Sequence, residues 1–236
     1  VILLIKEYKI RFSLKAEYVK DVLKFGAPLV PYSIGTLIIT SSDKYFLKTM
    51  EGLAILGIYT VGYSMGQIII FIASAIDTSI SPKIYNRLGR FEAEVAEELV
   101  RYIYVYMIFL VVIAVLVTFA APYILRFWVG RDFQAASQFV LWICFGNIAF
   151  ALYRVFSQFI QYSKKTYLLT LSALITAPLA GLAIYVLIKL NGPIGAAQGV
   201  FAGYTIFCLI AWGFVQKLYP MPWLKIFWRG KGSVAS

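Results

Sequence analysis

Residues 102–121 read YIYVYMIFLVVIAVLVTFAA, a run of twenty positions without a single charged side chain. A helix needs about 20 apolar residues to cross the hydrocarbon core of a bilayer, and an uncharged run of this length is typical of a transmembrane helix. The stretch therefore predicts that this chain is embedded in a membrane.

The rest of the chain repeats the pattern. Hydrophobic residues make up 61% of the sequence and charged residues only 14%, whereas soluble domains carry about 25% charged residues. We predict an all-α, polytopic membrane protein whose six transmembrane helices lie at 25–42, 54–79, 102–121, 139–161, 167–188 and 194–215. Residues 43–53, 83–101 and 122–137 would connect them as loops or charged linkers.

The predicted bundle, residues 25–216, has a basic segment on either side of it. Residues 1–24 are amphipathic and basic, and we interpret them as a cytoplasmic connector. The opening VILLI resembles the end of an earlier span, so we expect a longer chain that begins before Val1. Residues 217–236 mix tryptophan and phenylalanine with lysine and arginine, a combination typical of a segment that lies at the headgroups.

The distribution of basic residues predicts the orientation. Of the 22 lysines and arginines, sixteen fall in residues 1–24, 83–101, 162–166 and 217–236, and five fall on the other side of the predicted spans. Cytoplasmic loops carry the excess of positive charge, so we expect a multi-pass protein of the cell membrane with a cytoplasmic C-terminus. Topology then explains the net charge of +11 without a nucleic-acid partner.

Several enzyme classes are disfavoured by what the sequence contains. Gly62–Gly66 reads GYSMG and matches a hydrolase nucleophile elbow, which needs a strand–turn–helix and a histidine base, but the match falls in an apolar helix of a chain without histidine. Cys144 and Cys208 lie in separate apolar stretches and are typical of buried hydrophobic residues. We expect no enzyme, no cofactor and no metal. Gly62 and Gly66 are instead spaced for close helix packing.

Polar residues inside the spans carry the functional information. On the second span, spacings of three, four or seven place the following residues on one helical face: Thr60, Tyr63, Gln67, Ser74, Asp77 and Ser81. The fourth span does the same with Asn147, Arg154, Gln158 and Gln161. Arg154 lies ten residues before Lys164, which at about 1.5 Å per residue puts it roughly 15 Å inside the membrane.

Two interpretations of these charges stay open. A cation at that depth costs at least about 2.5–3.5 kcal/mol on insertion scales, so Arg154 must face a partner or a wet cavity. It either contributes positive potential for an anionic cargo or pairs structurally with Asp77 or with backbone carbonyls. Asp77 is likewise either structural or a site for coupling to protons or cations.

Three motifs resemble a known family. They are Leu23–Pro31 (LKFGAPLVP), Ser42–Leu47 (SDKYFL) and Leu56–Tyr59 (LGIY). This combination is similar to the opening of the second half of polysaccharide flippases, the Wzx-like branch of the multidrug/oligosaccharidyl-lipid/polysaccharide exporter superfamily. Lys44 stands where the family more often has arginine, and Ile80 stands before Ser81-Pro82 where it often has tryptophan.

The resemblance implies a fold and a function. The chain would form the second six-helix bundle of a two-bundle exporter, completed by an N-terminal half or a second copy. It would move an oligosaccharide linked to polyprenyl diphosphate across the membrane by alternating access. The polar faces and the second motif together give the candidate cavity residues Arg154, Lys44, Asp43, Gln67, Tyr63, Asn147 and Gln158, with Asp77 as the candidate for ion coupling.

Other functions compete with this expectation. A multidrug or small-molecule antiporter of the same superfamily would favour carboxylates in its cavity, and few lie inside these spans. A polymerase or ligase of sugar assembly would need a larger loop than 122–137 on the far side of the membrane. A structural membrane subunit gives Arg154 no role beyond an ion pair. The expected partners are the lipid-linked oligosaccharide, membrane lipids and polysaccharide assembly proteins.

Overall fold

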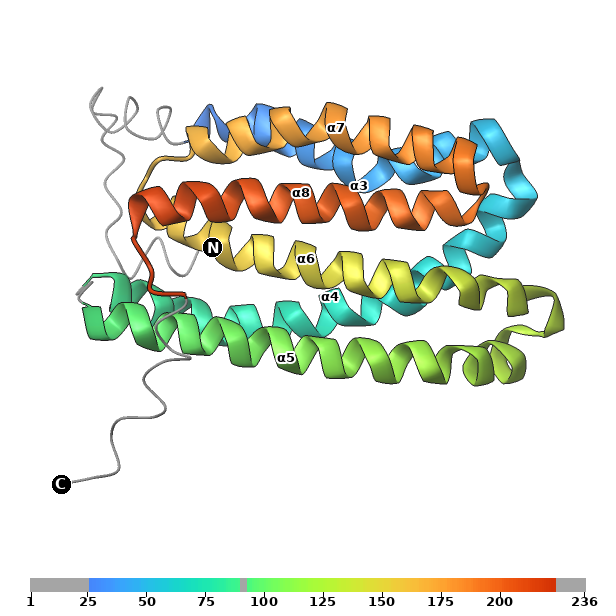
Figure 1. The fold of residues 1–236 in the computed structure, drawn as a ribbon, viewed down its shortest axis with the longest axis horizontal. Helices are drawn as coiled ribbons and strands as arrows, with labels where there is room; N and C mark the ends of the chain where they lie inside the picture. Colours follow the sequence, from blue (N-terminus) through green and yellow to red (C-terminus); the bar gives the residue numbers. More distant parts are fainter. Residues whose placement is uncertain (1–25, 90–92, 224–236) are drawn as a thin grey trace, which may run out of the picture.

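The computed structural model describes residues 26–89 and 93–223, which form a bundle of long helices (Figure 1). The α helices are α3 (Leu29–Glu51), α4 (Leu53–Leu88), α5 (Ala93–Ile124), α6 (Ser137–Tyr162), α7 (Tyr167–Asn191) and α8 (Ile194–Leu218). Successive helices run in opposite directions, so connections alternate between the two ends of the bundle. The all-α polytopic fold is confirmed, with no strand in the described residues. The predicted connector, residues 1–24, lies outside the described residues, and so does the predicted tail after Trp223.

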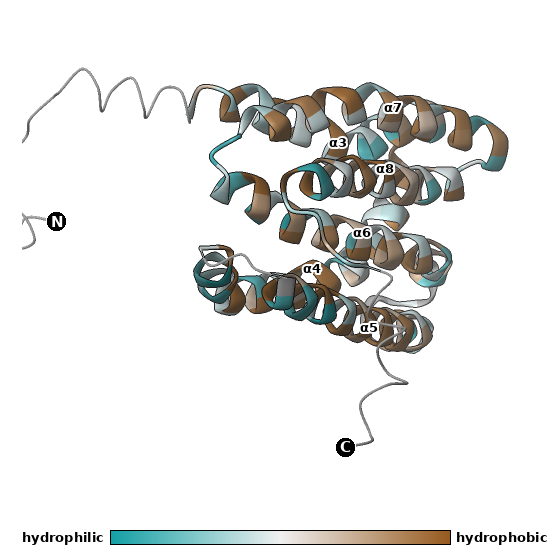
Figure 2. Ribbon diagram, turned by 60° about the vertical axis from the view of Figure 1, so that its left-hand side comes forward, coloured by the Kyte–Doolittle hydropathy of each residue, from teal (hydrophilic) through white to brown (hydrophobic). Residues whose placement is uncertain are grey.

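Five of these helices, α4 to α8, are long and apolar enough to cross a membrane. The first predicted span is the exception, because α3 does not reach the same hydropathy although it has 23 residues. Figure 2 shows apolar residues along most of the length of the helices and hydrophilic ones concentrated at the ends of α4 and α5. Large apolar side chains such as Phe71, Phe119 and Leu182 are exposed on the outside of the bundle, as expected for surfaces in contact with lipid.

The predicted loop at 43–53 is wrong, because α3 continues to Glu51 and only Gly52 separates it from α4. Gly52 has a φ of +88°, a backbone conformation that favours glycine. The polar residues that suggested a loop find partners within the bundle instead. Thr49 donates to the Tyr45 carbonyl, and Asp43 accepts a hydrogen bond from a tyrosine of α4.

The charged linker predicted at 83–101 is also mostly helical. The helix α4 runs through Pro82 to Leu88, and α5 begins at Ala93. Its 36 residues make α4 about 54 Å long, which exceeds the 40–45 Å of a bilayer with its headgroups. The joined ends of α4 and α5 therefore extend to the membrane surface or beyond it, which is why their sequence is charged.

Proline in the first turns of α3 is accommodated by a neighbouring helix. Pro31 has no N–H to donate to the carbonyl of Ala27, and that carbonyl accepts from Val30 instead. The Pro28 carbonyl accepts a hydrogen bond from the Thr170 hydroxyl of α7. Neighbouring groups therefore satisfy the carbonyls at these prolines.

Glycines bring helices into close contact, as the spacing of Gly62 and Gly66 predicted for α4. A Cβ added at Gly66 would lie 2.5 Å from Cγ2 of Ile143 on α6, and one at Gly199 would lie 2.6 Å from Cα of Ile184 on α7. Both distances are too short for any side chain. The α4–α6 and α7–α8 contacts therefore depend on glycine at these positions.

A substitution on α8 tests this packing. Gly199→Ala is expected to lower the free energy of unfolding by on the order of 1 kcal/mol, because the new methyl meets the α7 backbone. Gly213→Ala on the same helix is the matched control, since no atom lies within 4 Å of its added Cβ. It should be neutral or slightly stabilising through helix propensity. Thermal unfolding in one detergent compares the two, and equal losses would contradict the packing argument.

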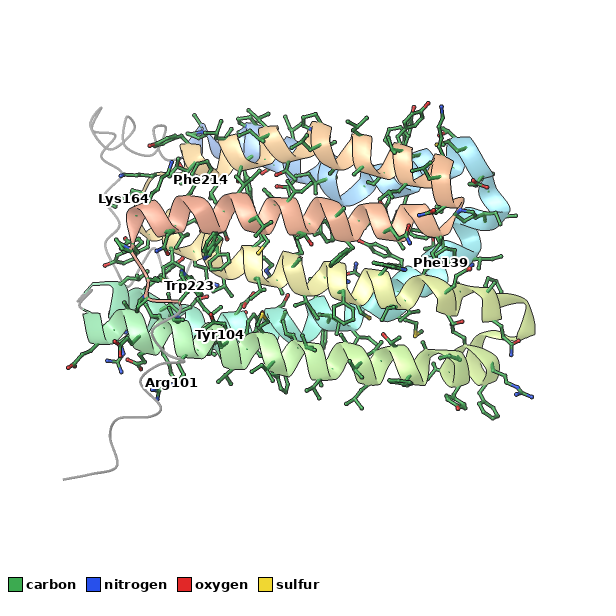
Figure 3. The ribbon with its side chains drawn as sticks, viewed as in Figure 1. Arg101, Tyr104, Phe139, Lys164, Phe214 and Trp223 are labelled. Atoms are coloured by element: carbon green, nitrogen blue, oxygen red, sulfur yellow. The ribbon has the colours of Figure 1, made fainter. Side chains whose placement is uncertain are left out.

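Trp223, which belongs to the segment expected at the headgroups, packs against one end of the bundle. Its indole N–H donates to Oε1 of Gln216 at 2.7 Å, and its carbonyl accepts from the hydroxyl of Tyr104 on α5. Its ring also contacts Phe156 and Trp212. Figure 3 shows Tyr104 and Trp223 together at one end of the bundle, opposite the end that holds Phe139. The segment after α8 thus ties α5, α6 and α8 together.

Candidate functional site

The polar residues of α4 and α6 meet along one contact between these helices, which we call the polar seam. It consists of Gln67, Ser74 and Asp77 of α4 with Asn147, Arg154 and Gln158 of α6. The two helices run in the same direction, so residues about eighty positions apart in the chain lie at the same depth. The two helical faces predicted from residue spacing therefore do face each other.

An ion pair occupies the middle of the seam. Nη2 of Arg154 lies 3.1 Å from Oδ2 of Asp77, and Nη1 donates to the Ser74 hydroxyl at 2.6 Å. The Tyr106 hydroxyl of α5 donates to the other carboxylate oxygen of Asp77 at 3.2 Å. The guanidinium and the carboxylate thus neutralise each other, and Tyr106 and Ser74 supply further hydrogen bonds.

The two partners of this pair differ in exposure. The Asp77 side chain is 7% exposed, whereas the Arg154 side chain is 30% exposed. The carboxylate is therefore enclosed between α4, α5 and α6, while part of the guanidinium side chain reaches the surface of the bundle. A ligand could approach Arg154 without first displacing Asp77.

Amides occupy the seam on either side of the pair. Asn147 is buried, and its amide donates to the Gly66 carbonyl at 2.8 Å, which joins α6 to α4 beside the close glycine contact. Gln158, about three turns of helix from Asn147 on the far side of Arg154, has a buried Oε1 with no hydrogen-bond partner in the described part of the chain. Asn147 is therefore structural, whereas Gln158 has hydrogen-bonding capacity to spare.

A second polar group lies nearer the α3–α4 connection. Asp43 has no exposed surface, and its Oδ2 accepts from the hydroxyl of the equally buried Tyr59 at 2.6 Å. Its other oxygen, Oδ1, has no hydrogen-bond partner among the described residues. Nζ of Lys44 lies 4.0 Å from the centre of the Tyr63 ring, and Tyr63 is within hydrogen-bonding reach of Gln67 and Tyr204.

The structure therefore divides the predicted cavity residues into two groups. Arg154 and Gln158 lie with Asp77 in the seam, and Asp43, Lys44 and Tyr63 lie toward the α3–α4 connection, with Gln67 and Asn147 between them. Two pockets in the described part of the chain lie away from both groups, one between the ends of α4 and α5 and one between α3 and α7. Neither is lined by a predicted site residue.

Three contributors were missed from the sequence. Tyr106, Tyr59 and Tyr204 all come from apolar stretches, where tyrosine is an ordinary constituent of a membrane helix. Tyr106 falls one turn after Tyr102 and stacks on it, with ring centroids 6.2 Å apart. An i, i+4 tyrosine pair in a span was the available signal, but the sequence does not indicate which helix it faces.

Comparison with known proteins gives a match over the first part of the chain. Residues 1–86 match a family model described as "Polysaccharide biosynthesis protein". No curated protein matches the chain. The matched region includes α3 and nearly all of α4, and hence Asp43, Lys44 and Asp77, but ends before Arg154. The resemblance noted from three motifs is thus found by an independent comparison in the same region.

Proposed function

We propose that this chain, of which residues 1–86 match the polysaccharide biosynthesis protein family, translocates a polyprenyl-diphosphate-linked oligosaccharide across the membrane. The proposal includes no enzymatic step. The protein would work by alternating access, with this helical bundle moving against a second bundle supplied by the rest of a longer chain or by another copy. We place the C-terminus in the cytoplasm, because the ends of α4, α6 and α8 share the basic side of the protein.

One observation supports the proposal more than any other, the partly exposed side chain of Arg154, which lies eight residues before the end of the membrane-length helix α6. The cargo carries an anionic diphosphate, which is costly to move through hydrocarbon. A guanidinium binds phosphate oxygens through parallel N–H donors. Asp77 neutralises and orients Arg154 while no cargo is bound. The diphosphate would become a second anionic partner of the guanidinium, beside Asp77.

The amide of Gln158 is also suited to binding the cargo. Its Oε1 has no partner among the described residues, and it lies one turn of helix from Arg154 on the same face of α6. An oligosaccharide presents many hydroxyl groups, which donate to such an oxygen. Gln158 would therefore accept a hydrogen bond from a sugar hydroxyl next to the guanidinium.

Transport in reconstituted vesicles tests the function directly. The protein, expressed from its complete reading frame, is placed in vesicles that contain a fluorescent polyprenyl-diphosphate oligosaccharide, and a membrane-impermeant glycosidase is added outside. Protein-dependent cleavage of the inner-leaflet pool is expected. Vesicles without protein measure spontaneous flipping. If the protein exports a cationic dye but leaves the inner pool intact, the antiporter alternative replaces this proposal.

A further inference from the structure

A pocket between the ends of α4 and α5 is separate from the polar seam. It has a volume of about 540 Å³. Its polar lining includes Lys83 and Arg87 of α4 and Glu98 of α5, and its apolar lining includes Ile84 and Leu99. None of these residues has a role in the proposed transport.

The length of α4 and the charged ends of α4 and α5 lead us to expect the pocket at the depth of lipid headgroups. The two helix ends that form it extend past the hydrocarbon core, because α4 alone is about 54 Å long. Exposed cations are found at the same end of the bundle, and Figure 3 shows Lys164 there, together with Arg101 pointing away from α5. A lipid headgroup is therefore the anion that this pocket meets in the membrane.

Charge and shape favour a phosphate with an attached acyl chain. Arg87 pairs with Glu98 at 3.1 Å, and both side chains remain about half exposed. Lys83 is exposed and lies in no ion pair within the described residues. The two other described carboxylates of this turn, Glu94 and Glu97, are not part of the lining. One lysine and one half-exposed arginine are thus available to an anion above the apolar surface of Ile84 and Leu99.

We infer that this pocket binds the headgroup of an anionic phospholipid. Lys83 and Arg87 bind the phosphate, and the start of one acyl chain packs on Ile84 and Leu99. Basic pockets between membrane helices at the headgroup level are suited to such lipids. The inference does not depend on the transported cargo, since the pocket and the polar seam share no lining residue.

One lining residue connects the pocket to the ion pair of the seam. Tyr102 lines the pocket and stacks on Tyr106, which donates to Asp77. A bound headgroup would therefore hold the α5 face that positions Asp77. This link places the lipid two aromatic side chains away from the Arg154 pair.

Native mass spectrometry of the purified protein tests the inference with two probes, phosphatidylglycerol and phosphatidylcholine with identical acyl chains. The wild-type protein is expected to retain phosphatidylglycerol preferentially. Lys83→Gln/Arg87→Gln should weaken that retention by on the order of tenfold, since each basic residue near the surface contributes a factor of a few. Lys165→Gln/Lys217→Gln removes two exposed cations at the same end but outside the pocket and should leave retention unchanged.

A gain of binding provides the second variant. Glu98→Gln releases Arg87 from its ion pair and should increase retention of phosphatidylglycerol, an effect that a folding defect cannot produce. The inference is overturned if phosphatidylcholine is retained equally, if the two double variants behave alike, or if Glu98→Gln leaves retention unchanged. Transport activity is not a readout in this experiment, so its result is independent of the proposed function.

Discussion

Arg154→Gln is expected to stop transport and to destabilise the bundle. The substitution leaves the Asp77 carboxylate enclosed between three helices with Tyr106 as its remaining partner. Removing one member of a buried ion pair costs about 3–5 kcal/mol, because the other charge stays buried and uncompensated. Unfolding in detergent micelles measures the first effect, and the vesicle assay measures the second. Arg126→Gln, an exposed arginine at the opposite end of the bundle, is the matched control and should change neither.

A second variant separates the role of Arg154 in folding from its role in transport. In Asp77→Asn/Arg154→Gln both charges are gone, and two neutral amides replace them. Stability should recover most of its loss, since no unpaired charge remains in the seam. Transport should stay absent, because the cargo diphosphate still lacks its guanidinium. A double variant that recovers stability and transport together would show that the pair is purely structural.

Helix number and type could be predicted because each span has its own signal. Uncharged runs such as 102–121 need no tertiary information to be identified as membrane helices. The α4–α6 contact was also accessible in part. Spacing placed Asp77 and Arg154 on polar faces of their helices, and glycine at 62 and 66 indicated close packing.

Helix ends and helix neighbours could not be predicted in the same way. Residues 43–51 are polar enough to suggest a loop, and they remain helical because α4 supplies a partner for Asp43. A single helix pattern does not say which other helix provides the partner. For the same reason Tyr106 was missed, since only the fold brings α5 to Asp77. Asp43 was taken as a cavity residue from its motif alone, while the structure gives it no exposed surface.

The burial of Asp43 predicts the second large effect, a loss of stability in Tyr59→Phe. Tyr59→Phe removes the hydroxyl that donates to Asp43, and the described residues provide no other side-chain hydrogen bond to this carboxyl group. Leaving a buried polar group without its partner costs about 1–3 kcal/mol. The two residues lie on either side of the Gly52 turn, so the loss should weaken the α3–α4 hairpin. Unfolding of the purified protein in detergent measures it, and Tyr45→Phe, at an exposed position of α3, is the matched control.

Replacing both Asp43 and Tyr59 distinguishes a purely structural hydrogen bond from a functional site that needs the Asp43 carboxyl group. Asp43→Leu/Tyr59→Phe removes the donor and the acceptor together, and such a change to apolar groups of similar shape can be nearly neutral. If the pair only fastens α3 to α4, the double variant should be more stable than Tyr59→Phe alone and should transport at the wild-type rate per folded molecule. Full stability without transport would mean instead that Asp43 takes part in the transport cycle, in a conformation that exposes the carboxyl group. The unpartnered Oδ1 of Asp43 would then be the atom available to an ion or to the cargo.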